Sequence, residues 1–174
     1  MNYNIKVLKG FGGRLLELKN YPNLKKLEIV NNEFNQELNN LPVGLKILKI
    51  VNRNFNEELK NLPEGLEVLE IWCYKFNQEL DKLPLGLKIL KIVGDNFNQK
   101  LDNLPLGLEV LEIDSFHFNQ KLGNLPLSLK KLYIDSKYLD YYSLEEVLEM
   151  IPLGCELYVD GKKLIYKLLR SNVK

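Results

Sequence analysis

A step of 21 residues recurs along this chain and limits how it can fold. Five phenylalanines are spaced by that step, and each is followed by an asparagine. The phenylalanines are Phe34, Phe55, Phe76, Phe97 and Phe118. The asparagines are Asn35, Asn56, Asn77, Asn98 and Asn119. A constant step of this size is typical of a solenoid, in which each unit is one turn of chain stacked on the next.

A second pattern, Leu-x-x-Leu-x-Ile, occurs once in each of six units and predicts a short strand. Its last two residues, such as Leu48 and Ile50, lie two apart and therefore face the same side of a strand. Strands that repeat without hairpin turns stack in parallel, about 4.8 Å apart. We therefore expect a leucine-rich-repeat solenoid, a right-handed superhelix with a parallel β-sheet on its concave face.

The segment that returns to the next strand is short and carries a Leu-Pro pair in five units, beginning with Leu41 and Pro42. Proline and the short length leave little room for an α-helix, so we expect turns, extended chain or 3-10 pieces on the convex side. The phenylalanines are expected to form a buried spine. The asparagines are expected to form a ladder that satisfies backbone groups buried behind the strands. Ligand binding by these asparagines is the weaker alternative, because five identical copies suit architecture better than chemistry.

The two ends of the chain depart from the repeat and are expected to cap it. The apolar run of residues 1–23 is interrupted by glycines between Gly10 and Gly13, which predicts two short strands around a glycine turn. We expect the repeats themselves to occupy residues 24–138. End segments of this kind cover the open edges of a sheet.

Residues 139–174 are expected to form a cap of a helix and a hairpin, within one domain of residues 1–174. Ser143 and Glu146 have the spacing of a capping box, which predicts a helix that Pro152 ends. Asp160 with the glycine that follows it predicts a hairpin turn.

Charge and composition exclude several classes of partner. Lys and Arg number 24 against 23 Asp and Glu, which lacks the basic excess that nucleic acids and anionic membranes attract. The sequence has no long apolar stretch and no signal peptide, so we expect a cytoplasmic protein. Cys73 and Cys155 have no disulfide or metal-ligand spacing and are expected to be free thiols, buried or half-buried.

Nothing in the sequence favours catalysis. The only histidine, His117, is expected at a turn, and carboxylates predicted on the sheet alternate with lysines that favour their ionised forms. No phosphate-binding loop, nucleophile elbow or His-Glu metal pair occurs. We therefore expect no enzyme activity, no cofactor and no metal.

The outward positions of the predicted strands form three rows that we take as the candidate binding surface. The central row alternates in charge and comprises Lys49, Glu70, Lys91 and Glu112. One flanking row comprises Ile47, Val68, Ile89 and Val110. The other comprises Val51, Trp72 and Val93. Apolar stripes on a sheet face often mark an interface, and Trp72 is the expected anchor. The alternative is that these residues only reflect strand propensity and are covered by Glu and Lys stems.

The units resemble the FNIP, or FGxxFN-motif, leucine-rich repeats of amoebae and giant viruses, from Leu24 to Tyr138. The resemblance rests on the Phe-Asn pair and on the run L-P-x-G-L-x-x-L-x-I, although the glycine three residues before Phe occurs only at Gly94. It implies a parallel-sheet horseshoe that binds a protein, in the host cytoplasm if the source is viral. Many relatives carry an F-box and select ubiquitylation substrates. Residues 1–23 are too few for an F-box, so that role would need a separate ligase-linking subunit.

Three functions follow as hypotheses. The first is a protein-interaction module that binds a macromolecular partner through the concave sheet face. The second is a homo-oligomeric structural element, for example a homodimer that buries Trp72. A substrate-recognition adaptor for ubiquitylation is the third, and a glycan or small-ligand binder is weaker than all of these.

Overall fold

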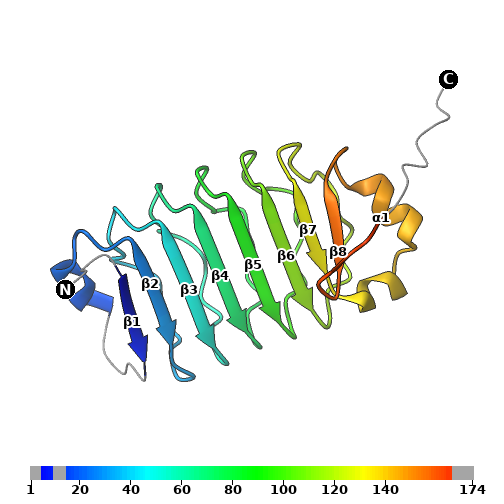
Figure 1. The fold of residues 1–174 in the computed structure, drawn as a ribbon. Helices are drawn as coiled ribbons and strands as arrows, with labels where there is room; N and C mark the ends of the chain where they lie inside the picture. Colours follow the sequence, from blue (N-terminus) through cyan, green and yellow to red (C-terminus); the bar gives the residue numbers. More distant parts are fainter. Residues whose placement is uncertain (1–4, 10–14, 166–174) are drawn as a thin grey trace.

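The computed structural model describes residues 5–9 and 15–165, and its strands form one sheet that runs the length of the solenoid (Figure 1). The sheet order follows the chain, with strands β1 to β8 parallel and β9 antiparallel to β8. The strands are β1 (Ile5–Lys9), β2 (Lys26–Val30), β3 (Ile47–Asn52), β4 (Val68–Cys73), β5 (Ile89–Gly94), β6 (Val110–Ser115), β7 (Lys131–Ile134), β8 (Glu156–Val159) and β9 (Lys162–Lys163). The predicted repeat solenoid with a parallel sheet is confirmed.

The strands pair in a register that places equivalent residues of successive units side by side. Leu48 of β3 pairs with Leu69 of β4, which pairs with Leu90 of β5. These inward leucines and the isoleucines two residues later are at most 3% exposed in β2 to β7. Burying a side chain of this size contributes about 1.5 to 3 kcal/mol. The stacked inward residues therefore make one continuous core between the sheet and the return segments.

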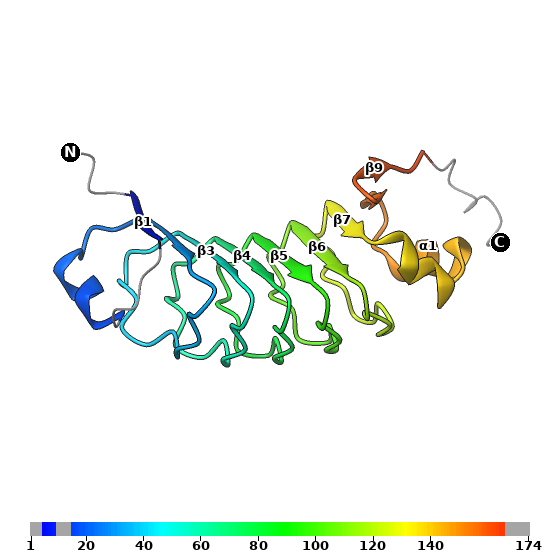
Figure 2. The same ribbon diagram turned by 90° about the horizontal axis from the view of Figure 1, so that it is seen from below.

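The five phenylalanines form a stacked column on the return side of that core. Neighbouring ring centroids lie 5.7 to 6.0 Å apart, and the rings are tilted by no more than 17°. Tyr138 continues the column, 5.5 Å from Phe118. Within residues 31–130 the return segments are turns and extended chain with no helix, as predicted. Figure 2 shows them opposite the row of strands, which lies along the inner side of a shallow arc.

The asparagine after each phenylalanine makes the expected ladder. Its Oδ1 accepts a hydrogen bond from the backbone N–H of the equivalent asparagine in the next unit, at 2.8 to 3.0 Å from Asn35 through Asn119. The ladder was expected to serve buried backbone groups, but it lies near the surface, because Asn77 and Asn98 are half-buried and the other three are exposed. The chain comes back to the surface directly after each phenylalanine, so water reaches these amides.

A second ladder, at the last residue of strands β3 to β6, serves the buried backbone. Asn52 is 3% exposed, and its amide donates to the Phe34 carbonyl while its Oδ1 accepts from the Phe55 N–H, both at 2.7 Å. Ser115 Oγ donates to the carbonyl of Phe97 at 3.0 Å, and Cys73 Sγ contacts that of Phe55 at 3.1 Å. Four different residues fill this position, so self-similarity could not reveal it.

Gly94 fills the same position in β5 and leaves no room for a side chain. A Cβ atom there would lie 2.0 Å from the carbonyl oxygen of Cys73 in the neighbouring strand. The equivalent positions of β3, β4 and β6 carry side chains, so this restriction is specific to β5.

The first residues of the chain differ from the expected pair of strands. Strand β1 pairs in parallel with β2, again at a 21-residue step. Residues Leu15–Asn20 form the 3-10 helix η1 rather than a strand. Leu15 and Leu18, three residues apart, fall on the same side of a 3-10 helix and are both buried. A parallel strand must be followed by a return segment, which is why residues 15–20 do not form the predicted second strand. The glycine turn lies within residues 10–14, outside the described residues.

The helix and the hairpin turn predicted near the C-terminus both form, and a 3-10 helix that was not predicted precedes them. After η2 (Ser136–Asp140) comes the helix α1 (Leu144–Met150), which begins at the predicted capping box of Ser143 and Glu146. Asp160 and Gly161 both have positive φ, at 47° and 72°, in the turn between β8 and β9. These are the angles that a tight hairpin turn requires.

The two ladders can be compared by a matched pair of substitutions. Asn52→Ala should lower the free energy of unfolding by about 2 to 3 kcal/mol, because it leaves buried groups of Phe34 and Phe55 without partners. Asn77→Ala removes a half-buried side chain of the outer ladder and should lower the free energy of unfolding by only about 0.5 to 1.5 kcal/mol. Urea denaturation followed by circular dichroism measures both, and an equal cost would contradict the assignment of the inner ladder.

The contact at Gly94 can be tested in the same assay. Gly94→Ala should lower the free energy of unfolding by about 1 to 3 kcal/mol or more, because the strands must separate to admit the methyl group. The control is Gly65→Ala, where the nearest atom to an added Cβ is the Lys46 amine at 3.6 Å. A Gly94→Ala protein as stable as the control would show that the backbones are not in close contact.

Candidate functional site

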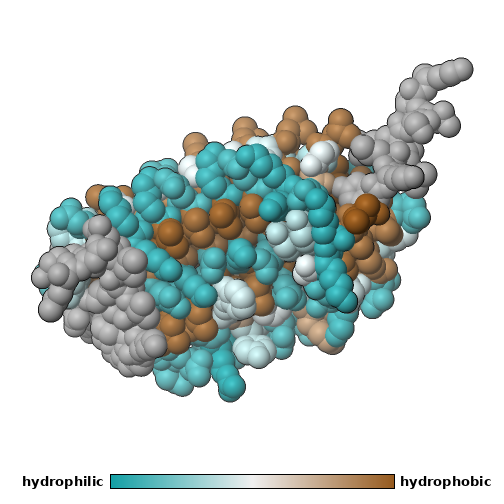
Figure 3. All heavy atoms as spheres, viewed as in Figure 1, coloured by the Kyte–Doolittle hydropathy of each residue, from teal (hydrophilic) through white to brown (hydrophobic). Residues whose placement is uncertain are grey.

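The predicted binding residues lie together on the solvent face of the sheet, in strands β3 to β6. Cross-strand pairing aligns each predicted row, for example Val51 with Trp72 and Trp72 with Val93. Figure 3 shows the result as a brown apolar band between teal charged bands. The sheet therefore turns residues 21 apart in sequence into a continuous surface, which we call the sheet face.

The central row of the sheet face carries its own ion pairs. Lys91 Nζ lies 2.8 Å from a Glu112 carboxylate oxygen, and Lys49 Nζ lies 3.7 Å from one of Glu70. The hydrogen bond to Glu112 raises the pKa of Lys91. Pairs this exposed contribute at most about 1 kcal/mol each. They balance charge along the centre of the sheet face, between its two apolar rows.

The apolar rows of the sheet face are only partly covered. The aliphatic residues in both rows are half-buried, and Trp72 keeps 40% of its surface exposed. Lys49 Nζ lies 5.0 Å from the centre of the Trp72 ring, so the lysine stem covers part of this region, as the alternative interpretation expected. The remaining indole surface stays accessible to a partner.

A hollow of about 560 Å³ opens beside Trp72, where β3 to β6 end. Its apolar walls come from Val51, Trp72 and Val93 of the sheet face and from two aromatic rings on the following turns, Tyr74 and Phe116. Those rings are 55% and 50% exposed. We call this feature the aromatic hollow. Sequence reasoning missed Tyr74 and Phe116, because only two units carry an aromatic residue on the turn after the strand.

Carboxylates border one side of the aromatic hollow. Asp95, Asp114 and Asp135 all line it, and the one cationic lining residue is Arg53. Partial burial raises the pKa of Asp114, and so do the nearby carboxylates of Asp135, Glu112 and Asp160. The row that begins with Val51 and Trp72 thus ends in a cluster of negative charge.

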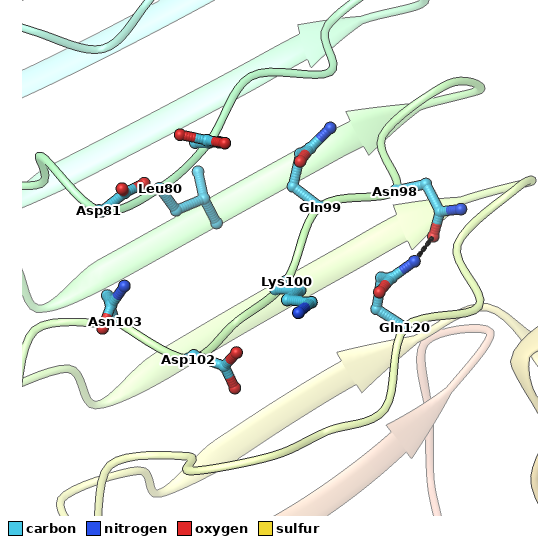
Figure 4. Close-up of a pocket in the computed structure, with 9 residues that line it drawn as sticks. Leu80, Asp81, Asn98, Gln99, Lys100, Asp102, Asn103 and Gln120 are labelled. Carbon is cyan, nitrogen blue, oxygen red and sulfur yellow. Dashed lines mark hydrogen bonds between the residues drawn. The ribbon is translucent and has the colours of Figure 1, made fainter.

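A second hollow lies on the opposite side, among the return segments, and measures about 410 Å³. Figure 4 shows its side chains, which come from successive return segments and include Asn98, whose Oδ1 accepts from Gln120 Nε2 at 3.2 Å. Among the described residues, Lys100 is the one cationic residue that lines it, together with the carboxylates of Glu79, Asp81 and Asp102. The side chains spread along the surface and do not converge on one point, so this hollow lacks the geometry of a catalytic site.

An exposed apolar ridge runs along the edge of the solenoid where the strands begin. Its residues follow the proline of each unit and are 72% to 92% exposed. They are Val43, Leu85, Leu106, Leu127 and Leu153. The repeat has Glu64 at the remaining position. Figure 3 shows the ridge as brown side chains along the upper edge. Sequence reasoning missed it, because the strand pattern says nothing about the exposure of loop residues.

The remaining reactive groups do not form a site within the described residues. Cys73 and Cys155 are buried thiols outside any disulfide, as expected, and burial raises the pKa of both, that of Cys155 to about 11. His117 is exposed and packs against the edge of Phe116. Residues 5–9 and 15–165 contain no cluster of His, Cys, Asp and Glu suited to a metal ion. The same ranges hold no helix with the length and apolar character needed to span a membrane.

Comparison with known proteins identifies the repeat. The family model of the FNIP Repeat matches residues 34–74 and residues 76–116, so each match covers about two units of the solenoid. No curated protein matches the chain.

The cluster of carboxylates around Asp114 predicts that Asp114→Asn stabilises the folded protein by an amount that depends on pH. A carboxyl whose pKa is raised by folding destabilises the folded state once it ionises, and that cost persists at neutral pH. The variant should therefore be more stable than wild type at pH 7, by up to about 0.5 kcal/mol. The gain should disappear as pH falls through the ordinary aspartate value of 3.8.

Urea denaturation at several pH values measures this difference. Asp81→Asn, on a return segment, is the control for loss of one negative charge. A gain equal to that of the control, or one independent of pH, would show that Asp114 feels no repulsion from its neighbours.

Proposed function

Because the chain is built from repeats of the FNIP family and folds as a repeat solenoid, we propose that it is a protein-interaction module whose sheet face binds a protein partner. Solenoids of this kind present extended surfaces on a rigid scaffold and are suited to binding other macromolecules. The proposed role is non-catalytic, and the proposed partner is a protein.

One observation carries the proposal, the apolar surface around Trp72 on strands β3 to β6. The aliphatic rows beside it are half-buried and the indole is 40% exposed. Exposed tryptophan surrounded by aliphatic side chains is the composition of a binding hot spot. The ion pairs of the central row, 2.8 Å at Lys91 and Glu112, supply a polar surround that is already neutral. A partner that covers the central row therefore meets lysines and glutamates that are already paired with each other.

Self-association is a second candidate, and the apolar ridge favours it. Four of its five residues are leucines, and the three in successive units, at positions 85, 106 and 127, are at least 80% exposed. Contiguous apolar surface of this kind is rare on proteins that remain monomeric. A second copy could bury the ridge, which makes oligomeric state part of the test below.

The proposal predicts that a partner is lost when the sheet face is altered. A lysate pull-down with mass spectrometry would compare wild type with the triple variant Val51→Ser, Trp72→Ala and Val93→Ser, after circular dichroism confirms that the variant is folded. We expect at least one protein enriched by wild type to fall about tenfold or more with the variant, because truncating a hot spot costs 2 kcal/mol or more.

The matched control removes apolar surface from the ridge with Leu85→Ser and Leu106→Ser. Loss of the partner with this control alone would move the interface to the ridge and contradict the proposal. Identical protein lists from all three baits would also contradict it. Light scattering over a range of concentrations, on the same proteins, would detect self-association and show which surface it uses.

A further inference from the structure

The aromatic hollow differs in chemistry from the rest of the sheet face. Three carboxylates line it, those of Asp95, Asp114 and Asp135, against the single guanidinium of Arg53. The whole chain has a net charge of +1, so this negative character is local. Apolar walls and one-sided charge in the same hollow restrict which molecules can bind there.

The aromatic rings of the hollow already contact cations within the chain. Lys137 Nζ lies 3.0 Å from the centre of the Phe116 ring, and Lys49 Nζ lies 5.0 Å from that of Trp72. An amine at such positions is attracted by the negative face of the ring. These internal contacts show that the geometry around both rings suits a positively charged side chain.

We propose that the aromatic hollow binds a basic segment of the protein partner, with an apolar side chain against Trp72 and Val93 and an arginine or lysine against Asp114 and Asp135. The inference rests on the proposed function and specifies the partner's chemistry. A cationic side chain there offsets the repulsion among the carboxylates around Asp114. The same charges disfavour phosphate groups, which excludes nucleic acid from the hollow.

The spacing of the sheet sets the spacing of residues in the bound segment. Trp72 of β4 and Asp114 of β6 are two strands apart and share one row, with Val93 between them. Two strand spacings amount to about 10 Å. A polyproline II segment rises about 3.1 Å per residue with three residues per turn, so its side chains three positions apart face the same side. A segment lying across the strands therefore needs its apolar and basic residues about three positions apart.

Selection from a random-peptide phage library tests this chemistry and does not require the partner to be identified first. Wild-type protein is the bait, and fluorescence anisotropy then measures the affinity of a selected, labelled peptide. We expect recovered peptides to pair an apolar residue with Arg or Lys at about the spacing above. Their affinity should fall with added salt, because the charges involved are exposed.

Two double variants with the same change in net charge complete the test. Asp114→Asn with Asp135→Asn should weaken a selected peptide about tenfold, equivalent to about 1.4 kcal/mol. Asp81→Asn with Asp102→Asn, which alters the hollow on the return side, should leave it unchanged. Asparagine keeps the shape of aspartate, and at position 135 it preserves the capping oxygen that accepts from the Lys137 N–H.

The outcomes separate this inference from the proposed function. Equal affinity for both double variants, peptides without basic residues, or no saturable peptide at all would each overturn the basic-segment inference. The proposed function would still hold if the lysate partner were lost with the Trp72 triple variant. Loss of basic-peptide binding only with Asp114→Asn and Asp135→Asn would support both.

Discussion

In-register stacking of identical side chains is the interaction on which the rest of the structure depends. Each Leu-x-x-Leu-x-Ile strand has one half-exposed face and one face that only a neighbouring unit can bury. The phenylalanine column extends the same contact through the return side, with ring separations that vary by only a few tenths of an ångström from 5.7 to 6.0 Å. Because each turn of chain relies on its neighbours, the register that buries the core also fixes the rows on the opposite face.

Structural features that recur in every unit can be predicted from the sequence, whereas features that differ between units cannot. The strands, their register, the Phe column and the capping box of α1 all follow from spacing. The buried ladder of Asn52, Cys73, Gly94 and Ser115 does not, because these side chains differ and share only a place at the strand end. Its neighbour, the Asn35 to Asn119 ladder, is more exposed than predicted, because repetition shows that a residue is structural without showing how deep it lies. The 3-10 helix η1 differs from the predicted strand because three apolar residues in a short run suit either element equally well.

The candidate site likewise has residues that could be predicted from the sequence and residues that could not. The three rows that contain Ile47, Glu70 and Trp72 could be derived from the alternation of inward and outward residues along each strand. The structure places these rows side by side on the sheet face. Tyr74, Phe116 and Asp95 could not, since they stand on turns whose direction depends on backbone angles that the local sequence leaves open. The exposed leucines of the ridge were hidden for a related reason, because an apolar residue in a loop gives no sign of which way it points. Both surfaces arise from positions that the core leaves free to vary.

The alternation of Lys49, Glu70, Lys91 and Glu112 limits how this molecule can change length. Removing the single unit around β4 would place Lys49 beside Lys91, and like charges at strand spacing repel. Removing two adjacent units would leave every remaining neighbour of opposite charge, and the same holds for insertions. As far as this charge pairing is concerned, the solenoid therefore gains or loses turns most easily in twos. A lineage of such proteins would be expected to differ in length by whole pairs of repeats.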